Sequence, residues 1–424
     1  MSVAGESALA LRRWLADGAP AHEFQRRLAK LVATPWLLAT GEDFRYPTTE
    51  GGRPSPVTRL IHRYLDRVSL TATSDNVVAH AFVVVLQMVA PPTALFHPEV
   101  VARVIRGPTG DVPDIAQPPA RPPEVESPER AVGAELTDGF VEVDEGVRLH
   151  YVESGSGPLV VLLHGHPEFW YSWRHQIPAL VRAGHRVVAV DMRGYNTSDK
   201  PKGIDAYLLP TLARDIERLI RGLGAERAVV VGHDWGGGVA WELAAHHPEV
   251  VERLVAINSP HPERFLSGLR SVGQLRKSWY MAAYQLPTLP EAWFRSRDFS
   301  ILREALRDGA GPNSFTSADI ERYVDAASRP GALTAQINYY RALPRLMLRE
   351  PNRTRKIDVP VLVVWGDRDR YMSVEMAEPD RALVPNLRVE RLPDASHWPH
   401  LDEPERVNEL ILEFVREASV AGVP

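Results

Sequence analysis

The sequence of 424 residues contains no cysteine. This absence excludes disulfide scaffolds, thiol nucleophiles, iron–sulfur clusters and cysteine zinc sites, and it carries no information about the redox compartment. An excess of charge of one sign is also missing, because the formal net charge is only −5 although 24% of the residues are charged. Nucleic acid is therefore not expected as the main partner, since phosphate binding relies on clustered Lys and Arg.

Long hydrophobic runs are missing as well. The most apolar run, Val77 to Ala90, includes His80 and Gln87 and ends at two prolines. It is shorter than the roughly 20 residues that a membrane-spanning helix needs. The N-terminus has no positive segment ahead of an apolar one, so a secretory signal is not expected. We therefore expect a cytoplasmic protein without a membrane span.

Proline, by contrast, is abundant, and it divides the chain. Seven of the 36 prolines lie between Pro108 and Pro128. Because proline fixes φ and removes a hydrogen-bond donor, we expect residues 108–136 to be an extended linker. With 44% hydrophobic residues, the parts on either side can bury a core.

The part before the linker, residues 1–107, has helical patterns such as Ala8–Leu15, Ala21–Leu38 and Asn76–Ala90. It has no nucleophile motif, phosphate loop or metal-ligand spacing. The segments 34–47 and 95–108 resemble the helical tail of some bacterial flavoprotein monooxygenases, but no dinucleotide fingerprint precedes them, so flavin binding does not follow. We expect a small all-helical region of unknown role, with docking to a biosynthetic partner or to a second copy as possibilities.

The part after the linker alternates short β-branched runs with helical patterns, which predicts an α/β fold with a mainly parallel sheet covered on both faces. We assign residues 137–258 and 360–424 to this core. Residues 259–359 show helical pattern without a clear strand, and we expect them to form a helical cap over one edge of the sheet. The expected strands are Phe140–Val143, Arg148–Glu153, Leu159–Leu163, Arg186–Val190, Ala228–Val231, Leu254–Ile257, Val361–Trp365 and Leu387–Leu392.

The segment Gly232-His-Asp-Trp-Gly236 follows an apolar strand and precedes a helix. Small residues two before and two after a central residue allow the sharp turn that lifts the central side chain, here Asp234, above the sheet. Asp234 could instead be a helix cap. As a nucleophile it is already ionised at neutral pH, and its attack on an sp³ carbon gives a stable ester. An epoxide or a carbon–halogen bond therefore fits better than an amide.

A second motif, His164-Gly-His-Pro-Glu-Phe-Trp170, also follows a strong strand. The backbone N–H groups of His166 and Trp235 could hold the oxyanion that forms during ester hydrolysis. His164 and His166 alone are weak evidence for a metal, and we expect none.

Hydrolysis of an ester needs a base and an acid that orients it. His397, in a late loop before the last helix, is favoured as the base over His400. The loop after Val361–Trp365 offers Asp367 and Asp369, and the spacing does not choose between them.

Five segments together resemble the epoxide hydrolase branch of the α/β-hydrolase family. They are His164 to Gln176, Asp191 to Pro201, Gly232 to Gly237, Trp365 to Asp369 and Ser396 to Trp398, and the resemblance extends from about 137 to 420. It implies a nucleophile at Asp234, an acid at Asp369, a base at His397, no cofactor and a cis peptide before Pro167.

The resemblance also implies two cap tyrosines that protonate the epoxide oxygen. One matches Tyr340 in Asn338-Tyr-Tyr-Arg341. The position that matches the other is Ala283, and Tyr280 is our substitute, although packing of the cap is an alternative role. We expect Trp170, Tyr284 and Trp398 to line the pocket, and the aromatic cap suggests a small apolar epoxide.

Two alternatives remain open. In a haloalkane dehalogenase Trp235 would help to bind halide, but that branch usually adds an asparagine or a second tryptophan, and His166 occupies the asparagine position. A non-catalytic ligand-binding homologue would bind ligand without forming a diol.

Overall fold

The computed structural model describes residues 64–107, apart from 66, 69–70, 73–74 and 87–94, and residues 135–417, apart from 296–297, 312–313 and 351–354. The chain divides into two compact units, residues 1–120 and 121–424. Most of the predicted linker and the helices predicted before residue 64 lie outside the described part. Within that part, no helix is both long enough and apolar enough to cross a bilayer.

The described residues of the first unit include the helices α4 (Asn76–Leu86) and α5 (Pro98–Arg106). Val68, Val78, Leu95, Val100 and Val104 form a small apolar cluster of their own. This cluster explains why α5 forms, because its valines occur four residues apart and bury one face of the helix.

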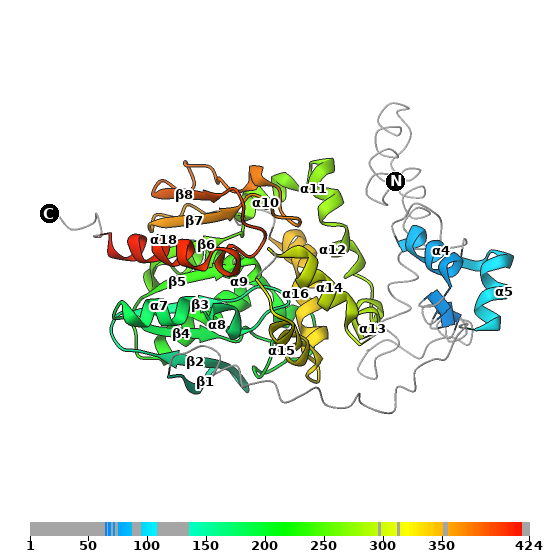
Figure 1. The fold of residues 1–424 in the computed structure, drawn as a ribbon, viewed down its shortest axis with the longest axis horizontal. Helices are drawn as coiled ribbons and strands as arrows, with labels where there is room; N and C mark the ends of the chain where they lie inside the picture. Colours follow the sequence, from blue (N-terminus) through cyan, green and yellow to red (C-terminus); the bar gives the residue numbers. More distant parts are fainter. Residues whose placement is uncertain are drawn as a thin grey trace. The chain divides into compact units, whose positions relative to one another are not determined.

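A single sheet organises the second unit (Figure 1). Its strand order is β1-β2-β4-β3-β5-β6-β7-β8; β1, β2 and β4 pair antiparallel and the other pairs are parallel. The strands are β1 (Thr137–Asp144), β2 (Val147–Ser154), β3 (Leu159–Leu163), β4 (Arg186–Val190), β5 (Ala228–His233), β6 (Val251–Ile257), β7 (Val361–Gly366) and β8 (Leu387–Leu392). All the predicted strands are present, and three of them have the predicted bounds.

The middle of the sheet is covered on both faces. Every residue of β3, β5 and β7 is buried, and successive strand residues point to opposite faces. Helix α7 packs against α18, and α8 packs against α9. The core helices are η2 (Trp170–Trp173), α7 (Gln176–Arg182), η3 (Asp205–Tyr207), α8 (Leu209–Gly222), α9 (Asp234–His246), η4 (Pro248–Val250), η5 (Val374–Met376), α17 (Pro399–Asp402) and α18 (Pro404–Arg416).

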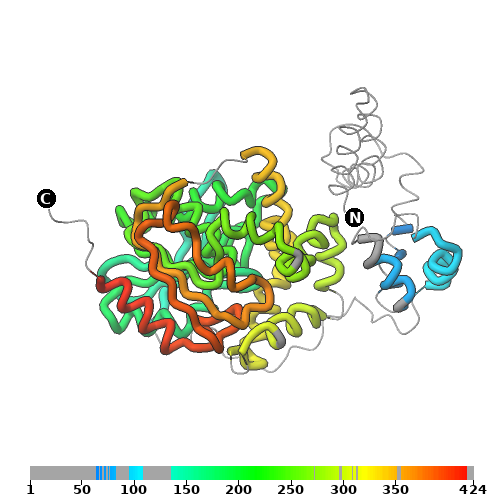
Figure 2. The backbone as a smooth tube through the Cα atoms, turned by 90° about the horizontal axis from the view of Figure 1, so that it is seen from above, coloured from blue at the N-terminus to red at the C-terminus, as the bar shows by residue number. Residues whose placement is uncertain are grey.

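The chain between β6 and β7 is helical in the described residues, which confirms the predicted helical cap. Figures 1 and 2 show these helices grouped at one end of the sheet. They are α10 (Pro262–Gly268), α11 (Val272–Lys277), α12 (Trp279–Ala283), α13 (Leu289–Arg295), α14 (Ser300–Gly309), α15 (Ser317–Ser328) and α16 (Ala332–Arg349). The parallel strands β3, β5, β6, β7 and β8 all end at the same edge of the sheet, so the loops after them meet there.

Candidate active site

Asp234 lies at the turn between β5 and α9 with φ 48°, in the left-handed region. Glycines make this turn possible. A Cβ at Gly232 would lie 2.5 Å from the Gly236 carbonyl oxygen, and one at Gly236 would lie 2.2 Å from the Leu163 carbonyl oxygen. The close approach of strand and helix therefore requires both glycines, and the strain at Asp234 is confined to one residue.

Each oxygen of the Asp234 carboxylate has its own neighbour. The backbone N–H of His166 donates to Oδ1 at 2.9 Å, and Nε2 of His397 lies 3.6 Å from Oδ2. Burial would raise the pKa of Asp234, but the hydrogen bond and charge of His397 outweigh it and lower the pKa. The carboxylate is therefore ionised at neutral pH. Trp235 was predicted as the second backbone donor. Within the described part of the chain, no hydrogen bond joins its N–H to the Asp234 carboxylate.

His397 is held from behind by Asp369, whose Oδ2 lies 2.7 Å from Nδ1 of the ring. The same oxygen accepts a hydrogen bond from the Asn258 amide at 2.7 Å, and Oδ1 accepts from the backbone N–H groups of Tyr371 and Met372. Burial opposes the charged imidazolium, but Asp369 and Asp234 outweigh it and raise the pKa of His397 to about 10. In the resting site the ring is therefore protonated between two carboxylates.

The two choices that the sequence left open differ in their geometry. His400 is fully buried with its ring against Trp173 and His233, whereas His397 faces the Asp234 carboxylate. Asp367 forms a bidentate pair with Arg391 at 2.8 Å, whereas Asp369 contacts His397. The arrangement favours His397 and Asp369.

Aromatic side chains of the cap contact the residues that adjoin the Asp234 carboxylate. The Tyr340 ring lies 5.0 Å from that of Trp235 and 5.4 Å from that of His166. Tyr280 and Tyr284 contact Tyr340 at 5.8 and 4.9 Å between ring centroids. The structure thus brings all three predicted tyrosines to the turn at Asp234 between β5 and α9, which we call the elbow.

Burial gives these groups defined protonation states. It raises the pKa of both Tyr280 and Tyr340 well above the usual value of a phenol. It lowers the pKa of His166 to about 4. At neutral pH the phenols keep their protons and the His166 ring is uncharged, so Tyr280 and Tyr340 are both available as proton donors.

One buried ion pair holds the cap tyrosines in place. Arg341, next to Tyr340 on α16, donates to Glu291 at 2.6 and 3.0 Å. Its Nε donates to the Tyr284 carbonyl oxygen at 2.9 Å, which ties α16 to the end of α12. Arg341 thus joins α16, which carries Tyr340, to α13 through Glu291 and to the end of α12 through the Tyr284 carbonyl oxygen.

The two tryptophans expected in the pocket differ in their distance from Asp234's neighbours. Trp170 is completely buried, with ring neighbours Phe169 and Tyr171, and the structure does not bring it into the group around Asp234. The Trp398 ring meets that of His397 edge to face at 5.0 Å between centroids, and its indole N–H donates to Glu168 at 2.5 Å.

Sequence reasoning missed Asn258, Glu168 and His233. Nδ1 of His233 lies 3.0 Å from the Glu168 carboxylate, and both side chains are buried beneath the elbow. Nε2 of His233 lies 2.8 Å from the His397 carbonyl oxygen. Glu168 and His233 stand inside the quoted motifs, whereas Asn258 follows β6 with only its position at a strand end as a signal.

Two groups of side chains among the described residues are of the kinds that bind metals and lie close together. They are Glu168, His233 and His400, and Glu217, His247 and Glu249. His164 and His166 belong to neither group. In the first, Glu168 already accepts hydrogen bonds from Trp398 and from the Gly165 N–H.

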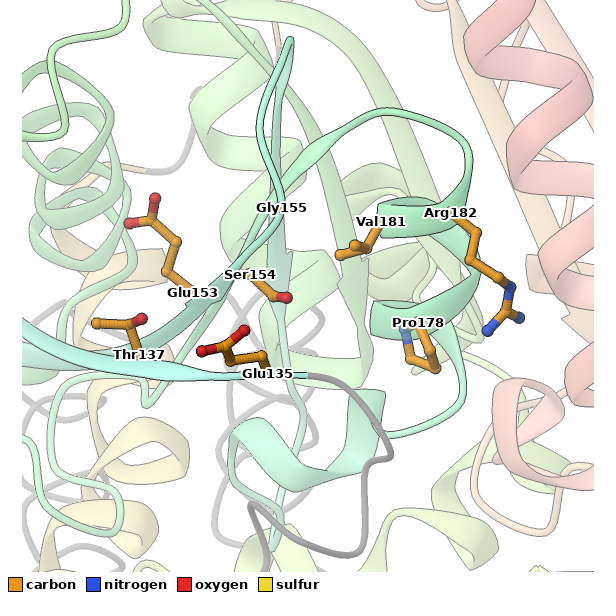
Figure 3. A pocket seen from close by; sticks show the side chains of 8 residues that line it. All are labelled: Glu135, Thr137, Glu153, Ser154, Gly155, Pro178, Val181 and Arg182. Atoms are coloured by element: carbon orange, nitrogen blue, oxygen red, sulfur yellow. The ribbon is translucent and has the colours of Figure 1, made fainter.

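A separate cavity of about 570 Å³ lies near the start of β1 and the end of β2 (Figure 3). Glu135, Glu153 and Arg182 contribute to its polar lining. Because Glu153 lies just before β3, this cavity is at the amino end of the parallel strands, opposite the edge that carries Asp234.

Three comparisons place this geometry among known proteins. The sequence model of the alpha/beta hydrolase fold family matches residues 158–404. The chain is 46% identical over 275 residues to the AB hydrolase superfamily protein YfhM of Bacillus subtilis (strain 168), covering 64% of this chain and 95% of that protein. It is 41% identical over 283 residues to epoxide hydrolase 4 of Mus musculus, covering 65% and 78%.

Solved structures show the same similarity. The Bacillus megaterium epoxide hydrolase in complex with an inhibitor matches with a TM-score of 0.60 and 33% sequence identity, covering 66% of this chain and 100% of that one.

Proposed function

The chain belongs to the epoxide hydrolase branch of the α/β-hydrolase family, and on that premise we propose that it opens an epoxide to a vicinal diol through an ester on Asp234. One observation carries the proposal: an ionised carboxylate at the elbow lies between a histidine on the sheet side and proton-bearing tyrosines on the cap side.

In the first step the carboxylate attacks an epoxide carbon. Oδ1 is occupied by the His166 N–H, so Oδ2 is the attacking oxygen. A Cγ–Oδ2–carbon ester forms, the carbon–oxygen bond of the epoxide breaks, and Tyr340 or Tyr280 gives its proton to the departing oxygen.

In the second step water hydrolyses the ester. Esterification removes the negative charge of Asp234, one of the two groups that raise the pKa of His397. The pKa of the ring then falls, so the ring releases its proton, which restores the phenol of the tyrosine that donated in the first step. As a neutral imidazole it takes a proton from water, whose oxygen attacks Cγ. Oδ1 carries the developing charge against the His166 N–H, and Trp235 is the expected second donor. His397 gives this proton to Oδ2, the diol leaves with Oδ2, and the oxygen of water stays in Asp234. The new carboxylic acid passes its proton to His397, which restores the resting pair.

A single turnover in ¹⁸O-labelled water, with enzyme in excess over styrene oxide, tests this route. The first diol should carry no label, and the label should appear in the peptide that contains Asp234. Label in the first-turnover diol would refute the ester. Asp234→Asn under the same conditions is the matched control and should form neither labelled peptide nor diol.

We also propose that the substrate is small and apolar, that the protein works in the cytoplasm, and that residues 1–107 provide a docking region for a partner or a second copy. The aromatic lining of the site supports the first point. Light scattering of the full chain across a concentration series tests self-association; a constant monomer mass would contradict the second-copy form.

A further inference from the structure

Two exposed tryptophans stand out on the cap. Of the large hydrophobic side chains that are exposed among the described residues, only Trp279 and Trp293 are tryptophans, at 49% and 42% exposure. They come from the successive helices α12 and α13, and their ring centroids are 6.2 Å apart. Tryptophan has a large apolar surface and is rarely placed in water as a pair without a reason.

The exposed charge on residues 270–295, which include this pair, has one sign. Arg270, Arg276 and Arg295 are exposed on the same stretch of chain. The only acidic residue between 270 and 295 is Glu291, which is buried and paired with Arg341. The exposed surface of this stretch therefore combines indole rings with guanidinium groups that form no ion pair with another described residue.

A chain of aromatic contacts connects the pair to the site. Trp293 contacts Phe294 at 6.4 Å, Phe294 contacts Tyr284 at 5.9 Å, and Tyr284 contacts Tyr340. Trp279 immediately precedes Tyr280 in α12. The surface pair and the tyrosines that face Asp234 are thus two sides of one thin helical layer.

We propose that Trp279 and Trp293, flanked by Arg270, Arg276 and Arg295, dock the protein on the surface of an anionic lipid bilayer. Indole rings prefer the depth of the lipid headgroups, and arginine side chains are attracted to anionic lipids over a short range. A protein partner or a second copy would also cover an apolar pair, but neither accounts for the absence of any exposed acidic side chain between 270 and 295. Docking on this side would hold the cap against the phase in which apolar epoxides dissolve, and only this consequence rests on the proposed function.

Cosedimentation of the full chain with two kinds of vesicle tests the proposal, one of phosphatidylcholine and one of phosphatidylcholine mixed with phosphatidylglycerol. We expect binding to the mixed vesicles, weaker binding to phosphatidylcholine alone, and loss of binding in high salt. The double variant Trp279→Ala/Trp293→Ala should bind the mixed vesicles at least about tenfold more weakly than the parent protein does. Its kcat/KM for a water-soluble epoxide should equal that of the parent protein.

Leu348→Ala is the matched control, because Leu348 is 84% exposed on α16 but lies outside the stretch 270–295. It should bind as the parent does. Three outcomes overturn the proposal. They are no binding to mixed vesicles, an equal loss of binding in Leu348→Ala, or a dimer in light scattering that depends on the two tryptophans and is unaffected by lipid. If vesicles are bound but no epoxide is hydrolysed, the proposed function fails and the docking surface stands.

Discussion

The two sides of the candidate site are held by different interactions. On the sheet side, hydrogen bonds and charge fix each polar atom of Asp234, Asp369 and His397. On the cap side, Tyr280, Tyr284 and Tyr340 are positioned by ring contacts and by one buried ion pair behind them. The difference implies that the sheet side sets which atoms carry charge, and the cap side sets where the oxygen of a substrate can lie.

The strongest test of the sheet side is Asp234→Asn. Removing the charged nucleophile should lower kcat by about 10⁴-fold or more, since a neutral amide cannot form the ester. Diol formation measured by chromatography gives the rate, and thermal unfolding checks that the variant folds. A rate within tenfold of the parent protein would show that charge on this side is not essential.

The next effect is expected from Asp369→Asn. The substitution removes a charge that stabilises the protonated form of His397, and the asparagine NH₂ can donate to Nδ1, which favours the wrong tautomer of the ring. We expect kcat to fall about 10³-fold or more, with the alkyl-enzyme accumulating because its hydrolysis needs the base. Mass spectrometry of the quenched reaction detects the adduct.

The same variant should change how His397 titrates. In the parent protein its pKa is raised to about 10, so the ring stays charged as pH rises from neutral to mildly alkaline. In Asp369→Asn the ring should lose its proton at a lower pH, which NMR of the imidazole can follow. An unchanged titration would mean that Asp369 does not control the charge of His397.

On the cap side, Tyr340→Phe and Tyr280→Phe each remove a proton donor but leave the ring packing in place. We expect each to slow epoxide opening by about 10- to 100-fold, less than the sheet-side variants, because one phenol can partly replace the other. Rapid-quench measurement of ester formation isolates this step. Tyr151→Phe, on β2, is the control, and parental rates in both cap variants would refute their role.

The smallest effect on chemistry, and the largest on cap stability, is expected from Arg341→Leu. It leaves Glu291 buried without its partner, which typically costs on the order of 3 kcal/mol. Arg345→Leu on the same helix breaks an exposed pair with Asp205 and should cost less than about 1 kcal/mol. Urea unfolding of both variants compares them, and equal losses would contradict a special role for the buried pair.

The two sides also differed in how far the sequence predicts them. Strands β3, β4 and β8 have the predicted bounds, because short β-branched runs between turn residues are a strong local signal. The left-handed turn at Asp234 and the cis peptide between His166 and Pro167 are present where motif and resemblance imply them. These features depend on neighbours in the sequence.

Features that depend on contacts between residues far apart in the sequence could not be predicted from local sequence patterns. No spacing rule chooses between Asp367 and Asp369, or between His397 and His400, since the choice depends on which side chain points along the sheet edge. The hydrogen bond from Asn258 to Asp369 joins residues on different strands. Trp170, in η2, and Trp398, just before α17, belong to the core and were predicted to line the pocket, but the sequence does not predict which side chains they contact.

The placement of these residues along the chain also bears on synthesis. The turn at Asp234 and its glycines are complete once β5 and α9 are made. Asp369 follows β7 and His397 follows β8, and both strands come much later in the chain. A growing chain that has folded only to α9 therefore has a carboxylate without the means to hydrolyse an ester on it. Under the proposed mechanism, full turnover requires the last two strands to join the sheet, which would couple reactivity to completion of these strands.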